Sequence, residues 1–306
     1  DKPVANVDVW HWKDERVQSI QMVRAEQDRR ATYRSALLLD GKRFVRLADA
    51  DMPTVSTTED GLWGIGALDK PYRLETNWGG SRADYYLLNT GTGERRPIAK
   101  ALTRTYGTSP DSKWFLYLKD KEVWAYEISS GNTRNISRPT GIGFVNEEDD
   151  HPYEKPIYGM AGWTKDGKSV ILNHRFDLWS LPLDGGKGQN ITGGTGDRDQ
   201  IVFRYVDLEP AEGDFQPPFP PPDETRRGGE DLQFRPGRRG PGGEKPIDTT
   251  QPLLLSASGE WTKKSGYFRL KLGEAPQSLI YQDRSIGRPM KAKNADRLLF
   301  TMQTFV

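Results

Sequence analysis

Three stretches of the chain follow one template, and this repeat decides the fold. They are residues 84–98 (DYYLLNTGTGERRPI), 122–136 (EVWAYEISSGNTRNI) and 177–191 (DLWSLPLDGGKGQNI). Each opens with an acidic residue, followed by an aromatic residue at +2, a glycine at +9 and an isoleucine at +14. Apolar residues alternate with others before the glycine, which is the period of a strand, and glycine suits a tight turn. Each stretch predicts two antiparallel strands joined by a turn, and a weaker fourth copy begins at Ser265.

A second motif precedes these copies and supplies two more strands. Residues 109–113 (SPDSK) and 164–168 (TKDGK) each lie just ahead of a copy, and residues 58–61 (TEDG) are a third version. A hydroxyl residue followed by Asp and then Gly or Ser is turn chemistry, because the side chains bond to the local backbone. Apolar segments such as 114–118 (WFLYL) follow the turns. The repeating unit is therefore a four-stranded antiparallel meander.

Units of this kind, recurring every 40 to 55 residues or so, have the size of propeller blades. One blade cannot bury both faces alone, so stacking around a shared axis follows. We therefore predict an all-β fold, a β-propeller of four-stranded antiparallel blades, with about five blades in this chain and a ring that is either complete or incomplete. One N-terminal helix precedes it.

The N-terminal helix is predicted over residues 14–30. Asp14 is the expected cap, Glu15 suits the positive end of the helix dipole, and Val17, Ile20 and Val23 fall on one face. The preceding residues 9–12 (VWHW) predict either a short strand or an aromatic wedge that packs the helix onto a sheet. We divide the chain into a linker segment with the helix, residues 1–32, and a β-propeller, residues 33–306.

Residues 209–248 interrupt the repeat. They are rich in proline and glycine, as in the segment 217–222 (PPFPPP). Such a composition predicts a flexible insertion within a blade.

Composition excludes several classes of function. The 306 residues contain no cysteine, which excludes disulfides, cysteine-ligated zinc, iron–sulfur clusters and thiol nucleophiles. The formal net charge of +1 argues against a nucleic-acid partner. No apolar run approaches the 18 residues or so of a membrane span.

We expect a soluble chain and leave its compartment open, with periplasmic and secreted locations included. It opens with Asp1 and ends in a strand-like segment, so we expect a piece of a longer or processed protein.

The residues of a hydrolytic triad are not evident. A serine on a nucleophile elbow needs Gly-x-Ser-x-Gly, which is absent. The nearest serine, Ser109, belongs to a predicted blade turn. The three histidines, His11, His151 and His174, are too few for a transition-metal site. We predict no catalytic residue, no metal site and no cofactor in this chain.

The segment 146–152 (NEEDDHP) is a dense acidic turn between two predicted blades. Clustered carboxylates suit calcium. They also suit the charged amino end of a peptide, and they occur in ordinary solvated loops. The spacing differs from an EF-hand loop, and the three alternatives stay open.

An ordered set of short pieces carries a resemblance to a known family. The pieces are 8–14 (DVWHWKD), 44–47 (FVRL), 51–53 (DMP), 69–72 (DKPY), 134–136 (RNI), 146–148 (NEE), 162–164 (GWT), 177–179 (DLW) and 291–293 (KAK). Together they resemble the propeller region of bacterial peptidases of the prolyl oligopeptidase family. The resemblance covers nearly the whole chain apart from the Pro/Gly-rich insertion.

The resemblance implies a serine peptidase as parent protein, whose propeller caps a separate α/β-hydrolase domain. That domain would carry the catalytic Ser, Asp and His, and the cap would admit small or unfolded peptides. In some dipeptidyl-peptidase relatives a glutamate pair on the propeller holds the substrate's amino terminus, and Glu147 and Glu148 match that pair in residue type. The implied function is a non-catalytic portion that gates and positions peptide substrates. The alternative is a free-standing propeller scaffold that binds protein or peptide partners.

Overall fold

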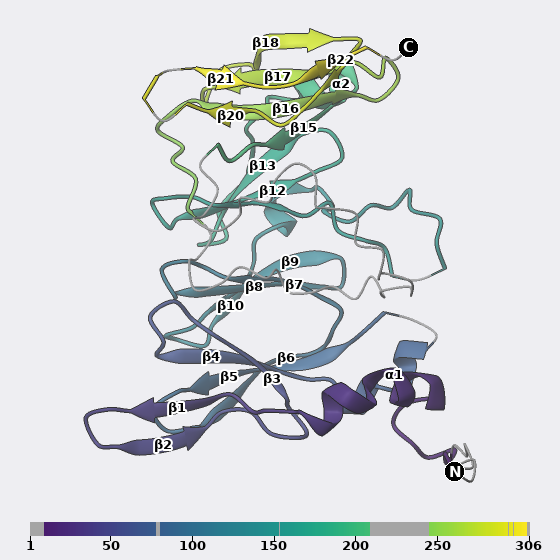
Figure 1. Ribbon diagram of the computed structural model, residues 1–306. Helices are drawn as coiled ribbons and strands as arrows, with labels where there is room; N and C mark the ends of the chain where they lie inside the picture. Colours follow the sequence, from purple (N-terminus) through teal and green to yellow (C-terminus); the bar gives the residue numbers. More distant parts are fainter. Residues whose placement is uncertain are drawn as a thin grey trace. The chain divides into compact units, whose positions relative to one another are not determined.

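The computed structural model describes residues 9–77, 80–152, 154–208, 245–292, 294–295 and 297–304 (Figure 1). These residues form two compact units. Unit 1 comprises Asp1–Arg138 and Val145–Ile157, and unit 2 comprises Pro139–Phe144 and Tyr158–Val306. Each unit is described by itself.

Unit 1 contains two four-stranded antiparallel sheets and one two-stranded ladder within its described residues. The first sheet is β3 (Thr54–Thr57), β4 (Trp63–Leu68), β5 (Ala83–Asn89) and β6 (Arg95–Leu102). The second is β7 (Arg104–Thr108), β8 (Trp114–Lys119), β9 (Glu122–Glu127) and β10 (Thr133–Asn135). The ladder pairs β1 (Ser35–Leu38) with β2 (Arg43–Arg46), and the short 3₁₀ helices η1 (Lys70–Tyr72) and η2 (Glu75–Asn77) follow β4. In both sheets, neighbouring strands are consecutive in the chain, which is the predicted meander.

The two sheets of unit 1 share one apolar core. Ile65 and Leu87 of the first sheet pack in the same buried cluster as Phe115 and Tyr117 of the second. A second cluster joins the β1–β2 ladder to the first sheet through Val45 and other apolar side chains. Apolar faces stacked in this way are what a four-stranded blade requires, because one blade alone leaves its faces exposed.

Unit 2 repeats this organisation. Its described sheets are β11 (Met160–Trp163), β12 (Ser169–Asn173), β13 (Leu178–Pro182) and β14 (Gln189–Asn190), and then β15 (Ile201–Tyr205), β16 (Leu253–Gly259), β17 (Ser265–Leu270) and β18 (Gln277–Gln282). Ile171 and Leu178 of the first of these sheets share a core with Phe203 and Leu255 of the second. A 3₁₀ helix, η3 (Arg138–Thr140), follows β10, and a short helix, α2 (Thr195–Asp199), precedes β15.

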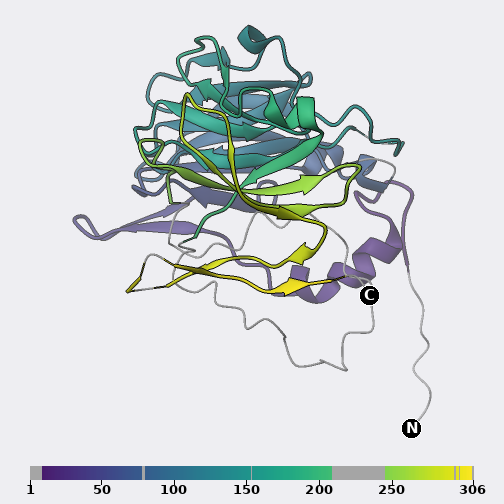
Figure 2. The same cartoon turned by 90° about the horizontal axis from the view of Figure 1, so that it is seen from above.

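The last described residues form a narrow antiparallel hairpin of short strands (Figure 2). β19 (Ser285–Ile286) pairs with β22 (Met302–Gln303), and β20 (Met290–Lys291) pairs with β21 (Leu298–Leu299). Several of its apolar side chains are exposed, among them Met290 and Leu299. No helix among the described residues is long and apolar enough to cross a membrane.

Residues that are equivalent in the sequence repeat occupy equivalent positions in the sheets. Trp124 on β9 lies opposite Asn135 on β10, and Trp179 on β13 lies opposite Asn190 on β14. The predicted fold class, an all-β chain of four-stranded antiparallel propeller blades with an N-terminal helix, is confirmed. The described residues contain four complete blades and three two-stranded ladders, against a prediction of about five blades.

The predicted limits and packing of the N-terminal helix were wrong. Helix α1 spans Gln18–Arg29, and Val17 stands at its N-cap without a side-chain cap. Asp14 instead accepts the backbone N–H of His11 at 2.9 Å and closes the turn before the helix. None of the twelve helix residues is buried, and Val23 is 80% exposed. Trp10 and Trp12 are also exposed, so these aromatics do not wedge the helix onto a sheet.

The predicted insertion lies between β15 and β16, and its residues 209–244 fall outside the described part of the chain. Its last residues, however, belong to the core of unit 2. Ile247 is 1% exposed and exchanges backbone hydrogen bonds with Trp163 and Lys165 at 2.7 and 2.8 Å. The Lys165 ammonium also lies 2.8 Å from Asp248. The prediction of a flexible segment up to residue 248 is therefore wrong for its final residues. The buried side chain of Ile247 anchors them beside β11.

Candidate functional site

The acidic turn predicted at residues 146–152 lies in unit 1 and is closed by its own backbone. Val145 and Ile157 form an antiparallel bridge, and the Asn146 N–H donates to the carbonyl of Pro156 at 2.7 Å. The side-chain oxygen of Asn146 accepts the N–H of Glu148 at 3.2 Å. These bonds hold the turn so that Glu147 and Glu148 are both exposed.

Glu147 forms an ion pair with the side-chain ammonium of Lys121, which belongs to another part of the unit. The Nζ atom of Lys121 lies 2.9 Å from Oε1 and 3.3 Å from Oε2 of Glu147. Both side chains are largely exposed, at 58% for Glu147 and 64% for Lys121. Lys121 could not be predicted as the partner of Glu147, because the two residues lie 26 positions apart and nothing in the sequence signals their contact.

Lys121 is positioned by a tight hairpin turn between β8 and β9. Lys119 pairs with Glu122, so that Asp120 and Lys121 form a two-residue turn with φ values of 52° and 63°. Positive φ at both central residues is the mark of a type I′ turn, in which glycine or asparagine is normally preferred. A lysine held in this conformation projects from the end of the hairpin, where it meets the acidic turn.

Two other side chains make hydrogen bonds to Asp149 of the turn. The His151 Nδ1 atom lies 2.8 Å from Asp149, and this hydrogen bond is the main reason that the pKa of Asp149 is lowered. The Lys155 ammonium donates to the backbone carbonyl of Asp149. Among the described residues, no group of three or more acidic or histidine side chains is arranged to hold a metal ion. The turn thus shows one contact between an ammonium group and a carboxylate, that of Lys121 with Glu147.

The serine nearest to a nucleophile motif has a structural role. The Ser109 hydroxyl donates to Asp111 at 2.5 Å and accepts the N–H of Trp114 at 2.9 Å, and Ser109 is only 3% exposed. Thr58 and Thr164 bond in the same way to Asp60 and Asp166, both at 2.6 Å. The three residues occupy equivalent positions in blade turns, as the sequence predicts. Ser109 is not an activated nucleophile.

The two other histidines also make local contacts. The His174 ring lies between Phe144 and Tyr158, at centroid distances of 6.3 and 5.4 Å, and its burial lowers its pKa. A neutral imidazole is therefore favoured there. His11 accepts the N–H of Lys13 at 3.1 Å. Neither ring is hydrogen-bonded to a serine in the described contacts.

Two of the three acids that open the repeats, Asp84 and Asp177, are buried and make internal hydrogen bonds. Asp177 accepts the Thr192 hydroxyl at 2.7 Å and the Gly196 N–H at 2.9 Å. Asp84 accepts the Tyr72 hydroxyl at 2.6 Å and the Ala101 N–H at 2.9 Å. These carboxylates accept hydrogen bonds from groups within the protein, so they are not available to a ligand.

No protein-family model matches the chain, and no curated protein matches it in sequence. Among solved structures it is similar to the β-propeller domain of the trilobed protease from Pyrococcus furiosus, with 11% identity, a TM-score of 0.36, and coverage of 85% of this chain and 66% of that chain. It is also similar to Porphyromonas gingivalis dipeptidyl peptidase 4, with 8% identity, a TM-score of 0.39, and coverage of 84% and 41%.

A eukaryotic initiation factor is a third structure of this kind, with 10% identity, a TM-score of 0.40, and coverage of 89% of this chain and 56% of that chain. The chain thus spans 41% to 66% of the length of these three proteins. Two of the three are named as a protease or peptidase, and the third as an initiation factor. At this level of similarity no activity is transferred to the chain.

Proposed function

We propose that the chain is the non-catalytic propeller portion of a serine peptidase that resembles prolyl oligopeptidases. It gates and positions peptide substrates for an α/β-hydrolase domain absent from this chain. The ordered sequence pieces that resemble this family support the proposal. So does the internal bonding of the turn hydroxyls at Thr58, Ser109 and Thr164, because it leaves these side chains without a catalytic role.

Glu147 and Glu148 are proposed to hold the amino end of the peptide. The observation that carries this assignment is the contact of Glu147 with the Lys121 Nζ atom at 2.9 Å. A lysine side chain and a peptide amino terminus both present a primary ammonium, so the carboxylate already binds the required group. An exposed ion pair of this kind contributes about 0–1 kcal/mol. A peptide that adds contacts of its own can therefore displace Lys121.

The test compares a free trialanine peptide with its N-acetylated form, each titrated calorimetrically into the chain. We expect the double variant Glu147→Gln with Glu148→Gln to weaken binding of the free peptide about tenfold, a loss of ~1.4 kcal/mol. Binding of the acetylated peptide should not change. Glu94→Gln is the matched control, because Glu94 is an exposed acid of the same unit that pairs with Arg96 at 3.1 Å. An equal loss of affinity for the free and the acetylated peptide would contradict the assignment of Glu147 and Glu148.

A second test concerns catalysis itself. The chain alone should hydrolyse no peptide ester, because its turn hydroxyls are bonded within the blades. Ester turnover by the purified chain that a serine-directed phosphonate abolishes would overturn the proposal.

A free-standing scaffold is the alternative function. The exposed apolar side chains of Met290, Leu299 and Met302 on the C-terminal hairpin favour it, because such side chains suit a protein partner. The reading frame beyond Val306 discriminates between the two functions. A Gly-x-Ser-x-Gly motif within the following few hundred codons supports the peptidase, and an immediate stop codon supports the scaffold.

A further inference from the structure

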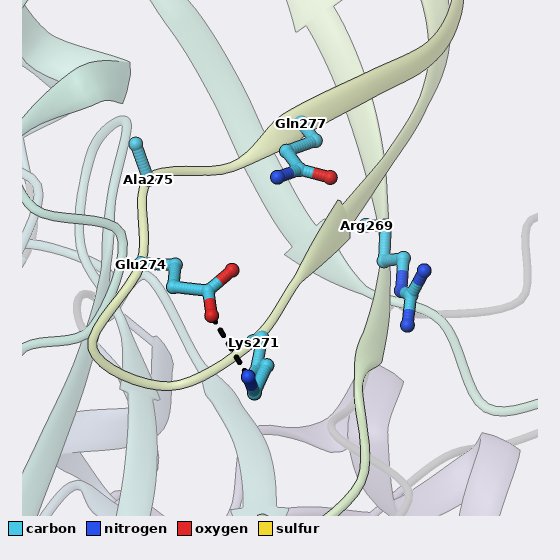
Figure 3. A pocket seen from close by; sticks show the side chains of 5 residues that line it. All are labelled: Arg269, Lys271, Glu274, Ala275 and Gln277. Carbon is cyan, nitrogen blue, oxygen red and sulfur yellow. Dashed lines mark hydrogen bonds and ion pairs between the residues drawn. The ribbon is translucent and has the colours of Figure 1, made fainter.

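The hairpin of β17 and β18 in unit 2 carries a polar recess of about 260 Å³ (Figure 3). Its lining residues are Arg269, Lys271, Glu274, Ala275 and Gln277. The recess is separate from the acidic turn, which belongs to unit 1. Its lining includes none of the acids that open the repeats.

Strand geometry brings the polar side chains of the recess to one face. Arg269 on β17 lies directly opposite Gln277 on β18, and opposed residues of an antiparallel pair project to the same side. Leu270 is fully buried while Arg269 is exposed, as the alternation of a strand requires. The turn that follows is closed by the Glu274 N–H, which donates to the carbonyl of Lys271 at 3.0 Å.

The charges in the recess are unequal. The Lys271 ammonium lies 2.9 Å from the Glu274 carboxylate, so these two charges compensate each other (Figure 3). The Arg269 guanidinium has no hydrogen-bond or ion-pair partner among the described residues. One net positive charge remains, together with the donors of a planar guanidinium and the side-chain amide of Gln277.

We propose that this recess binds an oxyanion, namely the terminal carboxylate or phosphate of a small ligand. A guanidinium presents two parallel N–H donors that match either group, and charge-assisted bonds of this type are about twice as strong as neutral ones. The volume equals about eight or nine waters at ~30 Å³ each, which exceeds one oxyanion and leaves space for the adjoining part of the ligand. The polar lining fits a charged end better than an apolar body.

The experiment titrates the full chain with inorganic phosphate and, separately, with acetate, while the side-chain Nε–H signal of Arg269 is followed by NMR. We expect a saturable shift with a dissociation constant of ~1 mM for at least one of the two anions. The anion that saturates at lower concentration identifies the group that the recess prefers. Arg269→Gln, followed through the backbone amides of residues 269–277, should weaken binding at least about tenfold.

Two further variants keep the result specific. Arg284→Gln removes another exposed arginine, beyond the other end of β18, and should leave binding unchanged. Glu274→Gln removes the competing carboxylate and should strengthen binding about threefold. An absence of saturation with both anions would overturn the proposal, as would equal weakening by Arg269→Gln and Arg284→Gln. Circular dichroism of each variant establishes that the blade is intact.

Discussion

The acidic residues of this molecule fall into two groups that differ in burial and in their partners. Asp177, which opens a repeat, is 2% exposed and bonds to Thr192 and to the N–H groups that begin helix α2. Glu147 in the acidic turn is mostly exposed and contacts the ammonium group of one lysine side chain. Both are carboxylates, yet that of Asp177 is enclosed by donors and that of Glu147 is open to solvent.

The difference separates residues that specify the fold from residues that can bind. Of the acids that open the repeats, Asp84 and Asp177 are buried and their bonds are internal. The acidic turn occurs once in the chain, and its Glu147 and Glu148 are exposed. The comparison predicts graded effects of substitution on stability, in which the buried repeat acids rank above the exposed turn.

Asp177→Ala should produce the largest loss. It removes an acceptor from three donors, Thr192, Gly196 and Asp197, and leaves those of Thr192 and Gly196 in a buried position. We expect the free energy of unfolding of unit 2 to fall by about 3 kcal/mol. Urea denaturation followed through tryptophan fluorescence measures this loss.

Asp177→Asn is the matched control for that substitution. It keeps one acceptor oxygen for Thr192 and Gly196 but loses the charge, so roughly half of the effect should remain. If Asp177→Ala proves as mild as an exposed substitution, the proposed division between the two groups of acids fails.

The next effect is expected at a blade turn. Ser109→Ala deletes the hydroxyl that accepts the Trp114 N–H and bonds to Asp111. A lost turn or cap hydroxyl of this kind costs about 1–2 kcal/mol. Ser109→Thr should retain most of the stability, because threonine fills the equivalent place in the turn at Thr164. Thermal unfolding of the two variants checks this, and equal melting temperatures would contradict it.

Much of this architecture could be predicted from the sequence because it is periodic. The opening acids, the aromatic residues and the hydroxyl turns recur at fixed spacings, and Trp124 and Trp179 occupy equivalent registers as a result. The bulges in the first strands of two blades were missed. They fall at Tyr106 and Ala161, three residues before the turn hydroxyl in each case, with a glycine next to each. That glycine, Gly107 or Gly162, was the available signal.

The parts that could not be predicted depend on single long-range contacts. Ile247 is one isoleucine after a Pro/Gly-rich stretch, and nothing local shows that it enters the core beside β11. The same holds for the contact of Lys121 with Glu147 and for the pairing of Arg269 with Gln277. Both depend on how the strands pair, and short-range sequence patterns do not reveal this pairing. Helix α1 was placed too early because Asp14 resembles a cap but bonds to His11.

Glu122 tests an intermediate case, because this repeat acid is only half-buried. Arg138 and Asn135 donate to its carboxylate, and the Arg138 hydrogen bond is the main cause of its lowered pKa. A lowered pKa in the folded state adds stability above the unfolded value of about 4.3, and this stability is lost as the pH falls through the folded value. Glu122→Gln should therefore reduce stability by less than about 1 kcal/mol at pH 7. The difference from the unsubstituted chain should shrink as the pH falls below about 4.3, as unfolding curves at pH 7 and at acidic pH would show.

The smallest effect is expected at Lys121, where two opposing terms are of similar size. The ion pair with Glu147 is exposed and contributes about 0–1 kcal/mol, while a non-glycine residue at positive φ costs about 1 kcal/mol. Lys121→Gly loses the pair but relieves the backbone, so its stability should stay within about 0.5 kcal/mol of the unsubstituted chain. Lys121→Ala loses the pair and keeps the strain, so it should be less stable than Lys121→Gly by about 1 kcal/mol. Denaturation of both variants measures these terms. A loss of more than about 2 kcal/mol in Lys121→Gly would mean that the acidic turn depends on this lysine for its structure, and Glu147 would then belong with the acids that specify the fold.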